Sequence, residues 1–318
     1  MKGAIVTPPP SLDEATRARL LLLVLGFTWG INWPVIKIAL SGLSPWTFRL
    51  YGFTVAAVTL MAVVKLTGRS LAVPRGMTWV HLFMSSLLNV VAFGVFSALA
   101  MMTASTGRVA VVSYSFPVWA CLLAWLILGE KLRGGAMLGL ALCIAGLVVL
   151  VYPVIGSAAL VGLGLALASA ITWAVGTIYL KLFRIPGDML VNTAWQVAIA
   201  AFVLLLFTLA FEGVPKFEPV PANALIATIF NGLVGSAISY LLWYHIVSHL
   251  PAATAALGSL ASPAIGVVLS VFILGEYPTT MDVIGFGLIF AAAMSVILQP
   301  RERATAAPPP APDPESSR

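Results

Sequence analysis

The chain consists mainly of apolar runs of membrane-span length, joined by short polar connections. A run of about 20 apolar residues is long enough to cross a bilayer as a helix, and these runs lack the alternation of a membrane β-strand. Only 9% of the residues are charged, against about 25% in soluble proteins. We therefore predict an all-α membrane protein. Its ten transmembrane helices are expected at about residues 20–40, 46–65, 79–103, 107–128, 134–152, 158–182, 189–211, 223–247, 252–274 and 280–298.

One motif occurs twice. The segment SFPVWACLLAWLILGE at 115–130 returns as SPAIGVVLSVFILGE at 262–276, with a Pro thirteen residues before the final Glu in both copies. Pro117 and Pro263 lie 146 residues apart, and the pair Thr-Trp at 28–29 returns at 172–173, an offset of 144. Anchors at nearly one offset indicate two structurally equivalent halves.

The distribution of positive charge predicts the orientation. If both tails are cytoplasmic, all but four of the 17 Lys and Arg residues face the cytoplasm, as the positive-inside rule requires. The four exceptions are Lys37, Arg49, Arg108 and Lys216.

Ten spans divide into five and five, so the second half enters the membrane from the opposite side. Glu130 is then cytoplasmic and is followed by Lys131 and Arg133, whereas Glu276 is external and is followed by no cation. Inverted repeats of this kind are typical of secondary transporters. We expect the first repeat at 17–152, the second at 153–300, and disordered cytoplasmic tails at 1–16 and 301–318, both polar and rich in Pro.

The sequence resembles the EamA type of the drug/metabolite transporter superfamily over about residues 20–298. The residues that carry the resemblance are Trp29-Gly30 with Asn32 and Lys37, Pro45 with Phe48-Arg49, Thr103-Ala104 and Ala110, Tyr114 to Pro117 with Leu128-Gly129-Glu130, and Gly139 with Gly146. The resemblance implies ten helices in two inverted five-helix repeats around a central substrate cavity. Members of the family include exporters of amino acids and other metabolites.

Polar and aromatic side chains at membrane depth are the candidates for function, because such groups are costly there and usually turn inward. The candidate substrate-binding residues are Trp29, Asn32, Arg49, Asn89, Ser113, Tyr114, Trp173, Thr177, Trp195, Tyr240 and Ser259. Pro117 and Pro263 are the candidate gate or hinge positions, because they occupy equivalent places in the two halves.

Each candidate also has a structural interpretation. Trp29 and Asn32 share a helical face, where they would either line the cavity or simply pack and hydrogen-bond between helices. Arg49 would either bind a substrate carboxylate or cap loop carbonyls. Lys37 is expected to snorkel to the interface, and Arg108 is expected to be interfacial. The repeat pairs Trp29 with Trp173, and two such rings on opposite walls would suit an aromatic or amphipathic substrate.

Several functional classes lack their sequence signals. No Asp or Glu falls mid-membrane and no Gly-rich phosphate loop occurs, so we predict neither an enzyme, a cofactor nor a metal site. Cys121 and Cys143 lie inside apolar runs, and the Gly-rich fifth and tenth spans are expected to serve packing or dimerisation.

The prediction is a bacterial inner-membrane exporter of small metabolites, foremost amino acids, that works by alternating access. Its expected partners are a small-molecule substrate and the lipid bilayer, with no nucleic acid. The alternatives are a membrane-embedded enzyme, a sensory or structural membrane protein, and a drug, sugar or nucleoside transporter of the same fold. The substrate, the coupling ion, the direction of transport and the oligomeric state stay open.

Overall fold

The computed structural model describes residues 12–131, 134–213, 219–249 and 260–298, and within these ranges all regular structure is helical. The first half contains α1 (Leu12–Ala39), α2 (Pro45–Leu66), α3 (Met77–Ser85), η1 (Ser86–Ala92), α4 (Phe93–Ala100), α5 (Thr106–Ser113), α6 (Phe116–Leu128) and α7 (Gly134–Val151). The second half contains η2 (Tyr152–Val154), α8 (Ala159–Leu182), α9 (Met189–Phe211), α10 (Ala222–Phe230), η3 (Asn231–Ile238), α11 (Ser239–His249), α13 (Ala261–Leu274) and α14 (Thr280–Ile297).

These elements confirm the predicted membrane helices. Nine helical stretches in the described residues are long and apolar enough to cross a bilayer, and α13 is a shorter apolar helix of 14 residues. The predicted ninth span also includes residues 252–259, which lie outside the described part of the chain.

Local sequence signals set several helix ends. Ser44 caps α2 by accepting a hydrogen bond from the Thr47 backbone N–H, and Pro45 follows at the first helical position. Asp188 caps α9 in the same way.

Gly129 and Gly275 both adopt the left-handed conformation, with φ of 68°. The repeated Leu-Gly-Glu motif is therefore a helix stop in both halves, where a side chain at the Gly would be strained.

The third and eighth spans each contain a π-helical segment that the sequence analysis did not predict. Each span was predicted as a single helix, and in the structure η1 interrupts the third and η3 interrupts the eighth. The two segments begin at Ser86 and Asn231, 145 residues apart, so they occupy equivalent places in the repeat. A π-helix accommodates one extra residue per turn, and such segments are frequent at functional sites.

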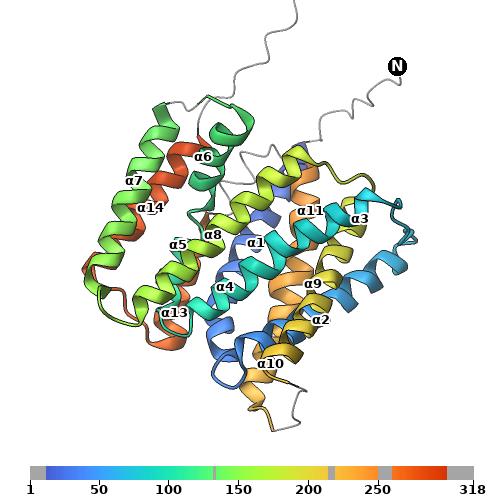
Figure 1. Cartoon of the computed structure of the whole chain (residues 1–318), viewed down its shortest axis with the longest axis horizontal. Helices are drawn as coiled ribbons and strands as arrows, with labels where there is room; N and C mark the ends of the chain where they lie inside the picture. Colours follow the sequence, from blue (N-terminus) through green and yellow to red (C-terminus); the bar gives the residue numbers. More distant parts are fainter. Residues whose placement is uncertain (1–11, 132–133, 214–218, 250–259, 299–318) are drawn as a thin grey trace, which may run out of the picture.

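The packing of the helices follows the repeat. In the first half α1 packs against α13 and the α10–η3–α11 span, and α8 makes the equivalent contacts with α5–α6 and with η1–α4. Helix α2 packs against its own equivalent α9, and α7 against its equivalent α14 (Figure 1). Exchanging the two halves leaves this set of neighbours unchanged. Because each half has an odd number of spans, the fold consists of two inverted five-helix repeats, as predicted.

The expected packing role of the fifth and tenth spans is confirmed. A Cβ added to Gly146 would lie 2.8 Å from Ile289 Cγ1 and 3.0 Å from the Gly285 carbonyl oxygen of α14. Glycine therefore allows the backbones of α7 and α14 to approach closely.

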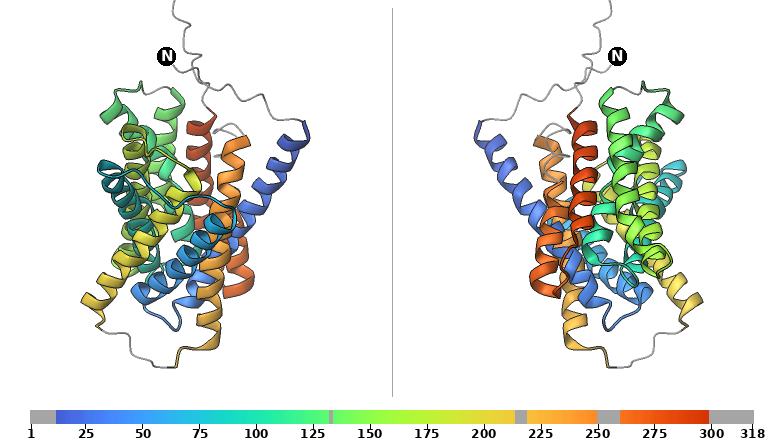
Figure 2. Two further views of the ribbon diagram at one scale, coloured as in Figure 1. Left: turned by 90° about the vertical axis from the view of Figure 1, so that its right-hand side faces the viewer. Right: turned by 90° about the vertical axis from the view of Figure 1, so that its left-hand side faces the viewer.

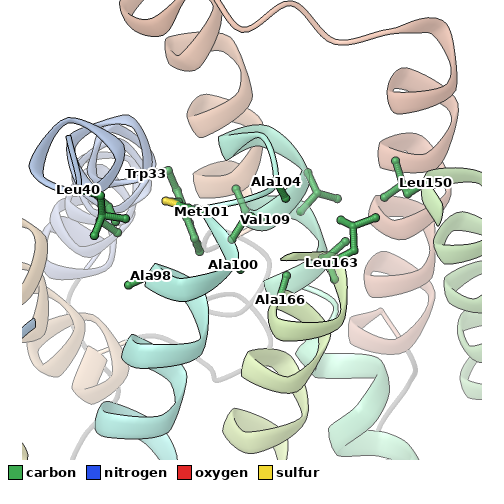
Figure 3. Close-up of a cluster of buried hydrophobic side chains, with 14 of the residues drawn as sticks. Trp33, Leu40, Ala98, Ala100, Met101, Ala104, Val109, Leu150, Leu163 and Ala166 are labelled. Carbon is green, nitrogen blue, oxygen red and sulfur yellow. The ribbon is translucent and has the colours of Figure 1, made fainter. Parts of the chain in front are cut away.

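A cluster of buried apolar side chains contains residues from both halves. Figure 3 shows part of it, with Trp33 of α1 near Met101 and Val109, and with Leu163 and Ala166 of α8 on the other side. These side chains hold α1, α5 and α8 together, and these three elements carry or flank most of the residues described next.

Candidate functional site

The fourth span is broken at its centre. Helix α5 ends at Ser113, Tyr114 and Ser115 form a turn, and α6 begins at Phe116 with Pro117 as its second residue. The expected form of this span was one continuous helix with a hinge at Pro117. The structure instead starts a new helix there, because Pro lacks a backbone N–H and is tolerated in a first turn, where that donor has no partner.

The two Pro-containing segments meet through side chains. The hydroxyl of Tyr114 donates a hydrogen bond of 3.0 Å to Oγ of Ser262, which is fully buried beside Pro263 in the first turn of α13. Ser113, also fully buried, lies 2.8 Å (Oγ to Oγ) from Ser169 of α8. The break in the fourth span therefore contacts the second half on two sides.

A row of aromatic rings begins at this break. Tyr114 lies edge-on to Trp33 with ring centroids 6.1 Å apart, and 6.0 Å from Phe116. Phe116 is followed at 5.9 Å by Trp173 of α8, which lies edge-on to Phe93 of α4 at 4.9 Å. We call Trp33, Tyr114, Phe116, Trp173 and Phe93 the aromatic row. It connects four spans from both halves.

Asn89 of η1 lies directly behind Trp173. Its Nδ2 donates to the Trp173 carbonyl oxygen at 3.2 Å, and its Oδ1 has no hydrogen-bond partner among the described residues. The amide fits against Gly176, where an added Cβ would lie only 2.1 Å from Oδ1.

Asn32 of α1 makes a similar contact on the other side of the molecule. Its Oδ1 accepts a hydrogen bond of 2.8 Å from Nδ2 of Asn231, and a Cβ added to Gly235 of η3 would lie 2.2 Å from that same oxygen. Its neighbour Trp29 packs against Trp243 with centroids 5.7 Å apart. Asn32 and Trp29 thus join α1 to the eighth span, and they lie in contacts separate from the aromatic row.

Arg49 is a buried cation with neutral partners. It is 5% exposed, its Nε donates to the Gly94 carbonyl oxygen at 2.8 Å, and its Nη2 donates to Ser97 Oγ at 3.0 Å. The guanidinium also lies 4.9 Å from the ring centroid of Phe48. None of the ion pairs found in the described residues involves Arg49. Tyr240 of α11 is near enough to interact electrostatically with this guanidinium.

Two of the remaining candidates, Thr177 and Trp195, donate hydrogen bonds to backbone carbonyl oxygens. Thr177 donates at 2.9 Å to the Trp173 carbonyl oxygen of its own helix. Trp195 donates from Nε1 to the Leu71 carbonyl oxygen at 3.0 Å and lies edge-on to Trp79, near the start of α3 and apart from the aromatic row. Ser259 lies outside the described residues.

Two cations have partners in other helices. Lys37, which was expected to snorkel to the interface, donates from Nζ to the Met101 carbonyl oxygen at the end of α4. Arg108, which was expected to be interfacial, has a side chain that is only 13% exposed and forms an ion pair with Asp282. Sequence spacing could not show either partner, because both acceptors are brought close by other helices.

Sequence reasoning also missed Phe93, Phe116, Gly176 and Gly235. The repeat contained a signal for two of them. Gly176 is equivalent to Asn32 at the 144-residue offset, and Gly235 is equivalent to Asn89 at the 146-residue offset. Comparing what stands at equivalent positions would have drawn attention to both glycines.

Two pockets in the described part of the chain both lie apart from these residues. The larger, of about 250 Å³, lies on the exposed face of α7 and has only apolar lining. The described residues hold no group of three or more His, Cys, Asp or Glu that could bind a metal ion. The polar groups near the break of the fourth span that join the two halves are the hydroxyls of Ser113, Tyr114, Ser169 and Ser262 and the amide of Asn89.

Comparison with known proteins agrees with this architecture. The profile of the EamA-like transporter family matches the chain twice, at residues 16–152 and at 160–298. The chain belongs to the EamA-like transporter family. A solved crystal structure aligns with a TM-score of 0.61 at 23% identity, over 86% of this chain and 95% of that one, and supports the fold.

Several curated relatives of this family member align over most of their length. An uncharacterized transporter, YvbV, of Bacillus subtilis is 28% identical over 89% of this chain and 92% of its own. A probable amino-acid metabolite efflux pump of Salmonella typhimurium is 25% identical over 90% and 96%. A probable terminal-alkyne amino-acid exporter of Streptantibioticus cattleyicolor is 25% identical over 90% and 94%.

Proposed function

We propose that this EamA-like transporter exports small amphipathic metabolites, foremost amino acids, across a bacterial inner membrane, with both termini in the cytoplasm. The observation that carries the proposal is the aromatic row at the break of the fourth span, where rings and hydroxyls from both halves meet. The two relatives named for amino-acid export support the substrate class.

The aromatic row would bind the apolar part of the substrate. Trp173 and Tyr114 are both half-buried, so their rings are not fully enclosed by protein. Aromatic rings offer a large apolar contact area, and Tyr adds a polar hydroxyl. Asn89, whose Oδ1 has no partner in the described residues, supplies an acceptor behind the row.

Arg49 would bind a carboxylate of the substrate. A buried charge is costly unless an opposite charge or strong hydrogen bonds compensate it. The partners of Arg49 in the structure are a carbonyl oxygen, a hydroxyl and aromatic rings. A carboxylate of the transported substrate would supply the opposite charge that these partners lack, and Tyr240 lies close by.

Alternating access would follow from the inverted repeat. The two halves can exchange conformations, so that one arrangement opens the path inward and the other outward. Pro117 and Pro263 begin or nearly begin helices at equivalent places and would absorb the backbone change.

Counterflow in proteoliposomes tests the proposal. Vesicles loaded with mixed amino acids receive a labelled aromatic or aliphatic amino acid outside, with and without a pH gradient. We expect label to accumulate, and we expect W173A to reduce the initial rate at least about tenfold, because losing an aromatic contact with the substrate worth about 1.4 kcal/mol weakens binding tenfold.

The matched control is Trp195→Ala, which removes a tryptophan that lies apart from the aromatic row. It should lower the rate much less than W173A. Absence of counterflow in vesicles that contain folded protein would exclude the tested amino acids, and equal losses in the two variants would contradict the placement of the substrate at the aromatic row.

A further inference from the structure

The α13–α14 turn of the second half holds the first turn of α5 in the first half. The carboxylate of Glu276 accepts a hydrogen bond of 2.7 Å from the Thr106 backbone N–H and one of 3.3 Å from the Thr106 hydroxyl. Thr106 is the first residue of α5 and is fully buried. The carboxylate therefore satisfies a free N–H at the positive end of a helix, where a negative charge is stabilising.

An ion pair lies one half-turn further along α5. Arg108 donates to Asp282 through two parallel contacts, Nε to Oδ1 at 2.5 Å and Nη2 to Oδ2 at 3.1 Å. The two side chains are 13% and 6% exposed. Bidentate pairs of this kind are among the stronger hydrogen bonds in proteins.

Asp282 is itself held in place. It accepts hydrogen bonds from the backbone N–H and the hydroxyl of Thr279 at 2.9 and 2.8 Å, and the Thr279 hydroxyl in turn accepts from the Asp282 N–H. This capping box begins α14. The carboxylate is thus fixed before Arg108 binds it, which reduces the entropy lost when the pair forms.

The contacts of Glu276 with Thr106 and of Asp282 with Arg108 join opposite halves at the same end of the bundle. The α13–α14 turn lies at the end away from the start of α1, as both views in Figure 2 show. The charge distribution makes this the external end.

The equivalent positions at the other end have a different chemistry. Glu130, the counterpart of Glu276, pairs with Lys181 at 3.1 Å, but both side chains are at least half exposed. The counterparts of Arg108 and Asp282 are Thr254 and Ala136, which cannot form an ion pair. Among the described residues, the ion pair shielded most from solvent lies at the α13–α14 end, whereas the pairs Glu130–Lys181 and Arg69–Asp188 between the halves are more exposed.

We propose that Arg108 and Glu276, with Asp282 and Thr106, form the external gate lock of this transporter. In the conformation described here the lock is closed. The outward-open state requires α5 to separate from the α13–α14 turn, so both contacts must break in each transport cycle. The inference rests on the proposed function, because a lock of this kind has a role only in a protein that alternates between two open states.

The test measures access from outside and needs no substrate. Val267 of α13 faces Gly107 of α5, with Cγ2 3.3 Å from the position of a Cβ on that glycine. Val267→Cys is introduced in a chain whose native cysteines are replaced, C121S and C143A. The rate of labelling by a membrane-impermeant maleimide is followed in right-side-out and inside-out vesicles.

We expect R108Q and E276Q each to raise the labelling rate in right-side-out vesicles about tenfold, since each removes a charge-assisted contact. R108K, which keeps the charge but loses the two-point geometry, should fall between R108Q and the parent chain. K181Q is the matched control at the other end and should leave external labelling unchanged, because its pair with Glu130 is solvent-exposed.

Three results would overturn the proposal. The first is an unchanged labelling rate in R108Q and E276Q that elute and melt as folded protein. The second is an equal increase of the labelling rate in K181Q. The third is an increase of the labelling rate in inside-out vesicles alone. Melting temperature and elution volume are measured for every variant, and R108K covers the case in which R108Q does not fold. Because labelling is independent of transport, a negative counterflow result and a failed lock are separate outcomes.

Discussion

The two contacts Asn32–Gly235 and Asn89–Gly176 are equivalent in the repeat, yet their residues are exchanged. In one contact the amide comes from α1 and the glycine from the π-helical segment of the eighth span. In the other the amide comes from the π-helical segment of the third span and the glycine from α8. The interface thus requires one amide and one residue without a side chain, and either helix can supply either of them.

The hydrogen bonding of the two contacts differs. Asn32 Oδ1 is satisfied by Asn231 Nδ2, whereas Asn89 Oδ1 has no partner in the described part of the chain. The backbone geometry has been kept in both halves while the chemistry has diverged. In the Asn32 contact it is Asn231 Oδ1 that has no partner among the described residues. The proposed function assigns the Asn32 contact mainly to the stability of the fold and the Asn89 contact to the substrate.

Exchanging the residues of one contact should give the largest effect. G176N alone would place two amides where the structure has room for one, because even a Cβ there lies 2.1 Å from Asn89 Oδ1. We expect a loss of about 3 kcal/mol in stability, typical of overpacking. The double variant N89G/G176N reproduces the arrangement of the other half and should recover most of that loss.

Thermal melting of the purified protein in detergent measures this prediction. The single variant N89G completes the mutant cycle and controls for the loss of the amide. If the double variant is as unstable as the sum of the two single variants, the two contacts are not interchangeable and the comparison fails.

The second prediction separates stability from transport. N32A leaves the Asn231 amide, which is 1% exposed, without its acceptor and should cost about 1–3 kcal/mol. N89A removes an oxygen that has no partner and one long hydrogen bond, so it should cost less than about 1 kcal/mol. Counterflow should nevertheless fall further in N89A than in N32A, after correction for folded protein. The opposite order in transport would remove Asn89 from the proposed site.

The smallest effect is expected at Thr177. Among the described residues its hydroxyl bonds the Trp173 carbonyl oxygen, the same atom that accepts from Asn89. Replacing Thr177 with Val keeps the shape and should change stability by less than about 0.5 kcal/mol, since Ser and Thr bonds within a helix add little. Melting and counterflow both near the parent values would support this. A large loss of transport with normal melting would restore Thr177 as a substrate-binding residue.

Much of the fold could be predicted because membrane helices are encoded locally. A run of apolar residues such as 189–211 is sufficient to predict a span, and the observed α9 covers Met189–Phe211. The twofold relation could also be predicted, because Pro117 and Pro263 lie at equivalent places in a repeated motif. Neither inference needs knowledge of which helices touch.

The candidate site was less predictable because its contacts join distant segments. Tyr114 was a candidate and Ser262 begins the second copy of the repeated motif, but their hydrogen bond spans 148 residues of sequence. The ion pair between Arg108 and Asp282 spans 174 residues, and neither residue had been assigned a partner. Trp195 shows the reverse case, since its depth in a predicted span did not reveal that its ring binds the backbone near α3.

The sequence by itself determined that this chain is a ten-span membrane protein of two equivalent halves, because hydrophobic length, helix stops and motif spacing are properties of contiguous residues. Only the tertiary structure decided where the fourth span breaks, where the π-helical segments lie and which side chains pair between halves. The physical reason is that a hydrogen bond or an ion pair acts over about 3 Å. Residues more than a hundred positions apart come that close only when the helices have packed.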